Sequence, residues 1–154
     1  MALRFEQGDI VKGNYPAFCQ QVNCKGVMGA GLAKQIREKY PEVYTSYKNH
    51  LWRCNDFGES PLGSVNVVHL SDGRWCANMF AQNTYGRTGI HTDYSAFRKC
   101  LEALTLKLTP NIESIAFPYG IGCGLAGGDW YLIKGLIENF SHKVKQKVII
   151  VVRE

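Results

Sequence analysis

The residues of this sequence best suited to chemistry lie in a glycine-rich stretch over 27–36, which reads Val-Met-Gly-Ala-Gly-Leu-Ala-Lys-Gln-Ile. Two glycines that flank one alanine let the backbone approach a ligand closely. A helical pattern begins at Leu32, so the unpaired N–H groups and the positive dipole end of that helix would face the same place. The stretch therefore predicts a binding site for an anion such as a phosphate. Taken alone, it is equally typical of a tight turn between two elements.

A second glycine-rich stretch, over 118–129, reads Pro-Tyr-Gly-Ile-Gly-Cys-Gly-Leu-Ala-Gly-Gly-Asp and contains five glycines. It also follows an apolar run and precedes a helical pattern. Two such loops in one short chain suggest two halves of a single ligand cleft.

Five side chains near these loops could take part in acid–base or nucleophilic chemistry. Asp129 begins a helical pattern, where a carboxylate is more often an N-cap than a catalyst. Cys123 lies between glycines, and a thiolate near a helix N-terminus can have a depressed pKa, although a small side chain packed under the loop is the simpler interpretation. His91 is a lone histidine, more typical of a surface or capping residue. Gln82 and Asn83 could orient a water molecule but could not take its proton efficiently.

Strands and helices that would position these residues alternate along the chain. Strands are predicted over 3–11, with a turn at 7–10, and over 18–22, 112–118 and 148–152; residues 64–70 and 74–80 form a hairpin around an Asp-Gly turn. Helices are predicted from Leu32 to Tyr40, from Pro41 through Leu51, from Thr92 or Asp93 to Leu108, and from Asp129 through Phe140. This alternation predicts an α/β fold with a mixed sheet between two helix layers. The first glycine loop would then follow the carboxyl end of a strand, where open α/β sheets bind their ligands.

The length of 154 residues is typical of one domain with a core of its own. The sequence shows no linker, no internal repeat and no apolar stretch of the roughly 20 residues that span a membrane. The N-terminal residues move directly into a strand pattern without the apolar core of a signal peptide, so we expect a cytoplasmic protein without a membrane partner. We also expect a monomer.

Six cysteines and four histidines are scattered through the chain. Without a secretory signal the cysteines are expected to be reduced thiols, and no spacing indicates a metal site. The net charge of +5 is compatible with an anionic small molecule or a nucleic acid. Because the basic residues are dispersed, the sequence shows no basic stripe of the kind that nucleic-acid-binding proteins carry.

Four motifs occur in an order and spacing that resemble the macro domain family. They are Gly8-Asp9-Ile10 after the first strand, Val22-Asn23, the loop Met28–Ala33 and the loop Ile121–Trp130. The resemblance covers essentially the whole chain, as a single macro domain over 1–154. It implies a three-layer α/β/α sandwich with a mixed, largely parallel central sheet. It also implies that the protein binds ADP-ribose and needs no cofactor.

The resemblance implies a role for each residue of these motifs. Asp9 would accept a hydrogen bond from the exocyclic amine of adenine, although an aspartate that bonds its own backbone in a turn is an alternative. Ile10 would pack beside the adenine ring, and Asn23 would reach the distal ribose. Backbone N–H groups of two segments would hold the phosphates and part of the distal ribose: Gly29, Ala30, Gly31, Leu32 and Ala33 on one side, and Gly120, Ile121, Gly122, Cys123, Gly124 and Leu125 on the other.

Within the family, the loops look most similar to those of terminal ADP-ribose protein glycohydrolases and yeast-type ADP-ribose 1″-phosphate phosphatases. The sequence departs from the glycohydrolases at two positions, since Gln82 stands where they carry a lysine and Ala126 where they carry an aspartate. A covalent mechanism through an amine is therefore in doubt. The catalytic candidates that remain are Asp129, Asn83 and Gln82, or an activated water molecule.

Three functions remain open at this point. The first is a hydrolase that releases ADP-ribose from modified macromolecules, with nucleic acid as a partner only if it is itself the ADP-ribosylated substrate. The second is an ADP-ribose 1″-phosphate phosphatase. The third is a reader that binds ADP-ribose without turnover.

Overall fold

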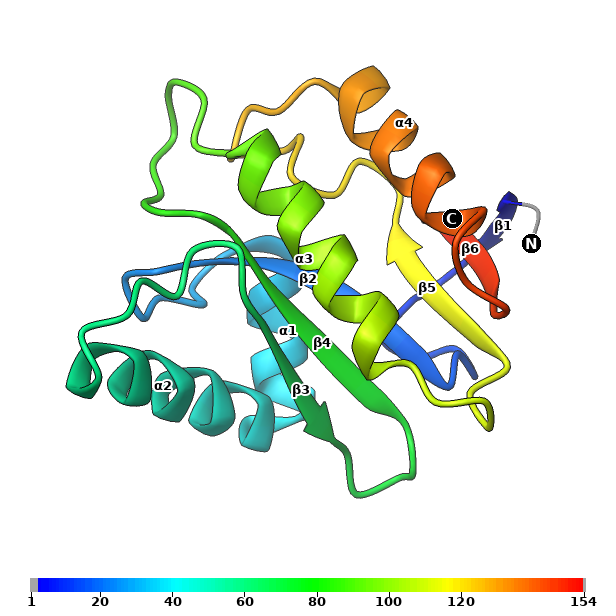
Figure 1. Ribbon diagram of the computed structural model, residues 1–154, viewed down its shortest axis with the longest axis horizontal. Coiled ribbons are helices and arrows are strands. Elements are labelled where there is room, and N and C mark those ends of the chain that lie inside the picture. The colour runs from blue at the N-terminus through cyan, green and yellow to red at the C-terminus, as the bar shows by residue number, and fades with distance from the viewer. Residues whose placement is uncertain (1–2, 154) are drawn as a thin grey trace.

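The computed structural model describes residues 3–153 and contains a six-stranded sheet covered by helices on both faces (Figure 1). The strands are β1 (Leu3–Gly8), β2 (Ala17–Asn23), β3 (Val65–His69), β4 (Trp75–Gln82), β5 (Ser114–Pro118) and β6 (Lys147–Arg153). The helices are α1 (Gly31–Lys39), α2 (Pro41–Asp56), α3 (Tyr94–Lys107) and α4 (Trp130–Ser141). No helix within residues 3–153 is both long and apolar enough to cross a membrane.

The strand order is β1-β6-β5-β2-β4-β3. Neighbouring strands are parallel except for β3 and β4, which form the predicted antiparallel hairpin. The sheet is therefore mixed and largely parallel, which confirms the fold class expected from the sequence.

Two apolar cores lie on the two faces of the sheet. Phe97 of α3 and Ile133 of α4 pack in one core, whereas Ile36 of α1 and Val43 of α2 pack in the other. The central strand β2 contributes to both cores because successive side chains point to opposite faces of the sheet. This arrangement is the predicted three-layer α/β/α sandwich.

The helix boundaries follow from capping residues and prolines. Asp93 caps α3 by accepting a hydrogen bond from the backbone N–H of Ala96 at 2.9 Å, so of the two predicted caps, Thr92 and Asp93, it is Asp93 that performs this task. Pro41 is the first residue of α2, where its missing N–H has no partner to lose. The predicted break between α1 and α2 is confirmed and consists of Tyr40 alone.

The strand order reverses between the neighbouring strands β2 and β5. Their pairing is given by one register pair, Phe18 with Ala116, whereas β5 pairs with β6 over five positions. In the sheet, β4 and β3 lie on one side of this point, and β6 and β1 lie on the other (Figure 1). Such a switch point leaves a crevice at the carboxyl ends of the strands, where open α/β sheets bind ligands.

Candidate functional site

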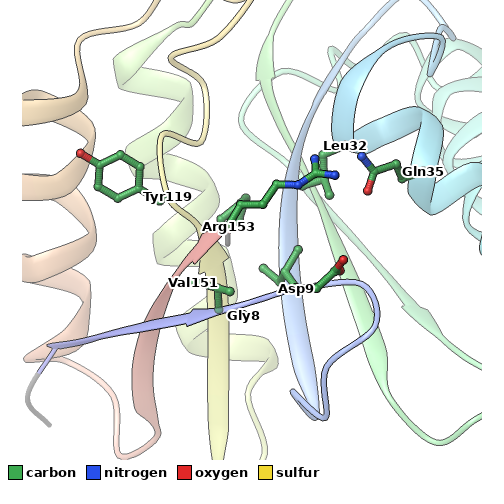
Figure 2. Close-up of a pocket in the computed structure, with 9 residues that line it drawn as sticks. Gly8, Asp9, Leu32, Gln35, Tyr119, Val151 and Arg153 are labelled. Atoms are coloured by element: carbon green, nitrogen blue, oxygen red, sulfur yellow. The ribbon is translucent and has the colours of Figure 1, made fainter.

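Two adjoining hollows occupy this crevice. The first is lined by Gly8, Asp9, Ile10, Leu32, Gln35, Pro118, Tyr119, Val151 and Arg153 (Figure 2). The second is lined by Gln20, Gln21, Ala30, Gly31, Leu32, Ala33, Gln82, Pro118, Tyr119, Gly120, Ile121, Gly122, Gly124, Leu125 and Ala126. Their volumes are about 180 Å³ and about 280 Å³, each below the roughly 300–1,000 Å³ of typical ligand pockets. The two hollows share Leu32, Pro118 and Tyr119, so a ligand the size of a dinucleotide would occupy both.

Asp9 stands at the end of β1 and lines the first hollow. Its Oδ1 accepts hydrogen bonds from the backbone N–H groups of Val11 and Lys12, both at 2.9 Å. Asp9 is thus a turn residue that bonds its own backbone, as the alternative interpretation of the sequence expected. Chiefly through the Lys12 N–H, these bonds lower the pKa of the Asp9 carboxyl, so the group is ionised at neutral pH. Its Oδ2 makes no hydrogen bond to any residue within 3–153, and it can therefore accept one from a ligand.

Three further side chains line the first hollow and were not identified from the sequence: those of Gln35, Tyr119 and Arg153. Arg153, the last residue of β6, extends across the hollow toward Gln35 (Figure 2). Tyr119 follows β5, is half exposed and has its ring 4.7 Å from that of Trp130. Arg153 pairs in register with Gly8 because β6 lies beside β1, which no local sequence signal reveals. The Arg153 cation thus lies near the carboxylate of Asp9, and Tyr119 lines the same hollow from the side of β5.

The start of α1 forms one wall of the second hollow. Ala30 is the N-cap residue, provides no side-chain hydrogen bond, and the first turn contains no acidic residue. The first N–H groups of α1 are therefore left for an anion, to which the helix dipole adds a favourable field. Ala30, Gly31, Leu32 and Ala33 line the hollow, whereas Gly29 is exposed and does not line it; their contact with phosphates stays a prediction.

The second glycine-rich loop forms the opposite wall. Gly120 and Gly122 have φ angles of 75° and 76°, a conformation that favours glycine. A Cβ at Gly122 would lie 2.7 Å from Oε1 of Gln21, so a larger residue would clash with the floor of the hollow. The loop is held further by a hydrogen bond of 2.9 Å from the Gly128 N–H to the Gly122 carbonyl.

Cys123 lies in this loop but does not line either hollow. Its side chain packs against the apolar core, and burial raises its pKa to about 11. The thiol is therefore neutral at physiological pH. Packing under the loop, the simpler of the two interpretations of Cys123, agrees with this position.

Asn23, at the end of β2, has its side chain turned into the protein. Its Oδ1 accepts hydrogen bonds from the Tyr47 hydroxyl at 2.8 Å and the Lys25 N–H at 3.0 Å, and its Nδ2 donates to the Val27 carbonyl at 2.8 Å. The residue is 7% exposed and lines neither hollow. In this structure Asn23 supports the first glycine-rich loop, and a direct contact with the distal ribose stays a prediction.

Gln82, the last residue of β4, lines the second hollow and is held at both ends of its amide. Its Oε1 accepts a hydrogen bond from Nε2 of Gln21 at 2.9 Å, and its Nε2 donates to the Thr84 carbonyl at 2.8 Å. Nε2 of Gln21 also donates to Oγ1 of Thr92, whose hydroxyl donates to the Gly122 carbonyl. This network fixes Gln82 relative to the second glycine-rich loop.

Two carbonyl oxygens in the floor of the second hollow lack partners. Oε1 of Gln20 and Oε1 of Gln21 are buried and accept no hydrogen bond from residues 3–153. Gln20 is 2% exposed, and its Nε2 donates to Oδ1 of Asn78 at 2.8 Å. A buried acceptor without a partner costs about 1–3 kcal/mol. Neither residue was predicted from the sequence, although two adjacent glutamines in a largely apolar strand were a usable signal.

Asp129 and Asn83, the other two catalytic candidates, do not line the hollows. Asp129 is exposed and caps α4, since its Oδ1 accepts a hydrogen bond from the Tyr131 N–H at 2.9 Å. The Asn83 side chain is exposed, and its backbone carbonyl accepts a hydrogen bond from the Cys24 N–H. His91 bonds the Thr88 carbonyl through Nε2 at 2.9 Å. Of the three catalytic candidates Asp129, Asn83 and Gln82, only Gln82 lines the cleft.

The second hollow is therefore lined by backbone groups, apolar side chains and the amides of Gln20, Gln21 and Gln82. Ala126 lines it as well, at the position where the related hydrolases carry an aspartate. No group of three or more histidine, cysteine or acidic side chains within residues 3–153 could hold a metal ion. The arrangement can bind an anion and hydroxyl groups, while any acid or base must act from the rim.

Comparisons with known proteins agree with this geometry. The Macro domain family model matches residues 19–135. A DNA ADP-ribosyl glycohydrolase of Mycobacterium tuberculosis is 30% identical over 130 residues, which are 83% of this chain and 35% of that protein. An ADP-ribose 1″-phosphate phosphatase of Scheffersomyces stipitis is 33% identical over 75 residues, which are 43% of this chain and 42% of that protein.

The solved macrodomain of Mycobacterium tuberculosis DarG superposes on this structure with a TM-score of 0.82 at 25% identity, covering 97% of this chain and 96% of that one. The chain thus spans the whole of that solved domain but only about a third of the curated glycohydrolase that it matches.

Proposed function

This chain belongs to the macro domain family, and from that premise we propose that it binds ADP-ribose in the cleft and hydrolyses the bond between the distal ribose and a modified macromolecule. The observation that carries the proposal is the meeting of the two hollows at Leu32, Pro118 and Tyr119. One hollow offers a carboxylate, a cation and an aromatic ring, and the other offers two backbone cradles.

Adenine occupies the first hollow in this proposal. Oδ2 of Asp9 accepts a hydrogen bond from the exocyclic amine, while Oδ1 keeps the turn intact. Ile10 and Tyr119 line the same hollow and supply apolar surface for the ring, and the Arg153 side chain extends across it. An ionised acceptor makes a stronger hydrogen bond than a neutral one, which favours an amine at this position.

The diphosphate lies between the start of α1 and the loop over 120–125. N–H groups at the N-terminus of a helix and in glycine-rich turns bind anions without a charged side chain. The distal ribose then lies beside Gln82, in the hollow that Gln20 and Gln21 also line.

Hydrolysis requires water to attack the anomeric carbon of the distal ribose. A bond forms between the water oxygen and that carbon, the bond to the macromolecule breaks, and its electron pair leaves with the macromolecule, which takes a proton from solvent. Gln82 can orient the water, and Asp129 is the candidate on the rim that can accept its proton. Cradled phosphates and fixed N–H dipoles stabilise the charge that develops in the transition state.

The name of the mycobacterial relative indicates which macromolecule to test first. That protein is a DNA ADP-ribosyl glycohydrolase, so ADP-ribosylated nucleic acid is the substrate we propose for this chain. Two other functions each have an observation in their favour. The 33% identical relative is an ADP-ribose 1″-phosphate phosphatase, and the absence of an acid or base among the side chains that line the second hollow favours a reader without turnover.

Incubation with three substrates separates these functions: ADP-ribosylated DNA, ADP-ribosylated protein and ADP-ribose 1″-phosphate, with products identified by mass. We expect free ADP-ribose to be released from the modified DNA. Inorganic phosphate from the third substrate alone would support the phosphatase. Micromolar ADP-ribose binding with no product from any substrate would support the reader.

The role of Asp129 is tested by Asp129→Asn, because asparagine also caps a helix but cannot accept a proton. We expect turnover to fall at least about tenfold, which corresponds to roughly 1.4 kcal/mol of transition-state stabilisation, with ADP-ribose affinity unchanged. Full turnover of Asp129→Asn would show that the residue is a cap only. Asp129→Ala is the companion variant, since it removes the cap as well.

A further inference from the structure

Four side chains of α1 and α2 alternate between cations and aromatic rings; Arg37 and Trp52 are exposed, and Tyr44 and Lys48 are half-buried. Arg37 of α1 lies over the Tyr44 ring, with its Cζ 3.7 Å from the ring centroid. Nζ of Lys48 lies 5.8 Å from the centroid of Tyr44 and 5.9 Å from that of Trp52. Residues four apart on a helix share one face, so Tyr44, Lys48 and Trp52 form a row along α2. We call these four residues, including Arg37, the aromatic–basic ladder.

The cations of the ladder are not neutralised by carboxylates. Within residues 3–153 the one ion pair joins Arg4 and Glu6, which both lie on the edge strand β1. Arg37 is exposed, and so is Lys25 in the loop that leads to α1. The Trp52 side chain is 60% exposed, so its ring is accessible to a partner. An exposed indole beside unpaired cations fits a partner that has both flat rings and negative charge.

The ladder begins next to the distal-ribose end of the cleft. The Tyr44 hydroxyl donates to the Gly26 carbonyl at 3.2 Å, and a Cβ at Gly26 would lie 3.3 Å from Nζ of Lys48. Two residues earlier in the same loop, the Cys24 N–H donates to the carbonyl of Asn83, the residue after Gln82. A chain attached to a ribose beside Gln82 could therefore leave the cleft over this loop and continue along α2.

We propose that the aromatic–basic ladder binds single-stranded nucleic acid, and that it holds the strand to which the ADP-ribose is attached; the second part rests on the proposed function. Unpaired bases stack on exposed aromatic rings, and phosphates between them pair with Lys and Arg. Tyr44 and Trp52 are eight positions apart, which corresponds to about 12 Å of helix and matches roughly two to four nucleotides of a single strand. A duplex does not fit this chemistry because its bases are already stacked and paired.

The first test uses an unmodified, fluorescently labelled DNA strand of about 12 nucleotides, within the usual site sizes for such proteins, with binding followed by fluorescence anisotropy at low salt. We expect Trp52→Ala to weaken binding at least about fivefold, because it removes one stacking platform. Lys48→Met should reduce the slope of log affinity against log salt by about one, because one phosphate contact is lost.

A matched control exists elsewhere on the molecule. Nζ of Lys134 lies 5.6 Å from the centroid of Phe5, a half-exposed ring on β1 at the edge of the sheet farthest from β3. Phe5→Ala and Lys134→Met should leave binding of the strand within about twofold of the wild type. Equal losses in Trp52→Ala and Phe5→Ala would overturn the proposal, and so would a labelled duplex that binds as tightly as the single strand.

The second test connects the ladder to the cleft. Trp52→Ala should raise KM for an ADP-ribosylated DNA strand at least about fivefold and leave KM for an ADP-ribosylated mononucleotide unchanged, because only the longer substrate reaches the ladder. Calorimetry with ADP-ribose gives the same Kd for wild type and Trp52→Ala if the variant is folded. If the wild type does not bind ADP-ribose, the proposed function is wrong. If Trp52→Ala changes KM by the same factor for the strand and for the mononucleotide, the ladder does not hold the strand.

Discussion

At the scale of single residues, Asp9 shows how one carboxylate can serve structure and recognition together. Its Oδ1 closes the turn after β1, and its Oδ2 is left at the surface of the first hollow. The two interpretations of Asp9 that the sequence left open are therefore compatible, since they involve different oxygen atoms.

We expect Asp9→Asn to weaken ADP-ribose binding at least about tenfold in calorimetry, which corresponds to about 1.4 kcal/mol. The asparagine oxygen can still accept the Val11 and Lys12 N–H groups, so the turn is preserved. Its amide nitrogen, however, places a donor where the adenine amine needs an acceptor. Unchanged affinity of this variant for ADP-ribose would show that adenine does not bind in the first hollow.

The lowered pKa of Asp9 also sets the pH range in which its carboxylate can contribute to ADP-ribose affinity. A carboxyl whose pKa is depressed in the folded protein stabilises that state above the unfolded value of 3.8, and the contribution is lost as the pH falls through the folded pKa. Asp9 is thus ionised from about pH 5 to 8, and its contribution to affinity should be constant across that range.

At the scale of elements, the start of α1 does most to define the phosphate site. Gly31 begins the helix with φ at +56°, a conformation that side chains other than Asn and Asp rarely adopt. A bulky acid such as Gly31→Glu is expected to abolish binding, but the positive φ means that it would also strain the backbone. A cleaner test keeps the backbone cost equal and changes only the charge.

Gly31→Asp and Gly31→Asn form such a pair. Both side chains tolerate a positive φ and have nearly the same shape, and no other atom lies within 4 Å of a Cβ at this position. We expect Gly31→Asp to abolish detectable ADP-ribose binding, because it places a carboxylate where a phosphate belongs, and Gly31→Asn to retain most of it. If both variants lose ADP-ribose affinity equally, the size of the side chain and not its charge prevents binding. If both bind as well as the wild type, the phosphates do not lie at the start of α1.

At the scale of the whole molecule, a ligand in the cleft would tie together parts that are distant in the chain. The first hollow joins the ends of β1, β5 and β6, and the second joins β2, β4 and the start of α1. A ligand that occupies both hollows would contact all of these elements, so it should stabilise the fold as a unit.

At an ADP-ribose concentration of 100 times Kd, binding to the native state should add about 2.7 kcal/mol to the free energy of unfolding. For a domain of this size, that corresponds to a rise in Tm of roughly 5–10 °C, measurable by scanning fluorimetry. AMP at the same concentration should raise Tm much less, since it fills one hollow and leaves the other. Equal shifts with AMP and ADP-ribose would contradict a ligand site that uses both loops.

Local sequence signals were sufficient to predict the elements and the two glycine-rich loops. Helix caps such as Asp93 and Asp129, the proline that opens α2 and the Asp-Gly turn between β3 and β4 are local signals, carried by residues a few positions apart. The glycine loops are local as well, since their backbone conformation depends on the missing side chains. Together these signals were enough to predict the three-layer fold and most of the cleft walls.

Which distant side chains face the cleft depends on how the strands and helices pack. Arg153 reaches the first hollow because β6 lies beside β1, and Gln21 holds Gln82 because β2 lies beside β4. Asn23 turns away because Tyr47 of α2 offers it a buried partner. The dispersed basic residues of the sequence likewise include Arg37 and Lys48, which the packing of α1 on α2 gathers around Tyr44. Each of these contacts depends on strand order or helix packing, and neither is encoded by the spacing of residues along the chain.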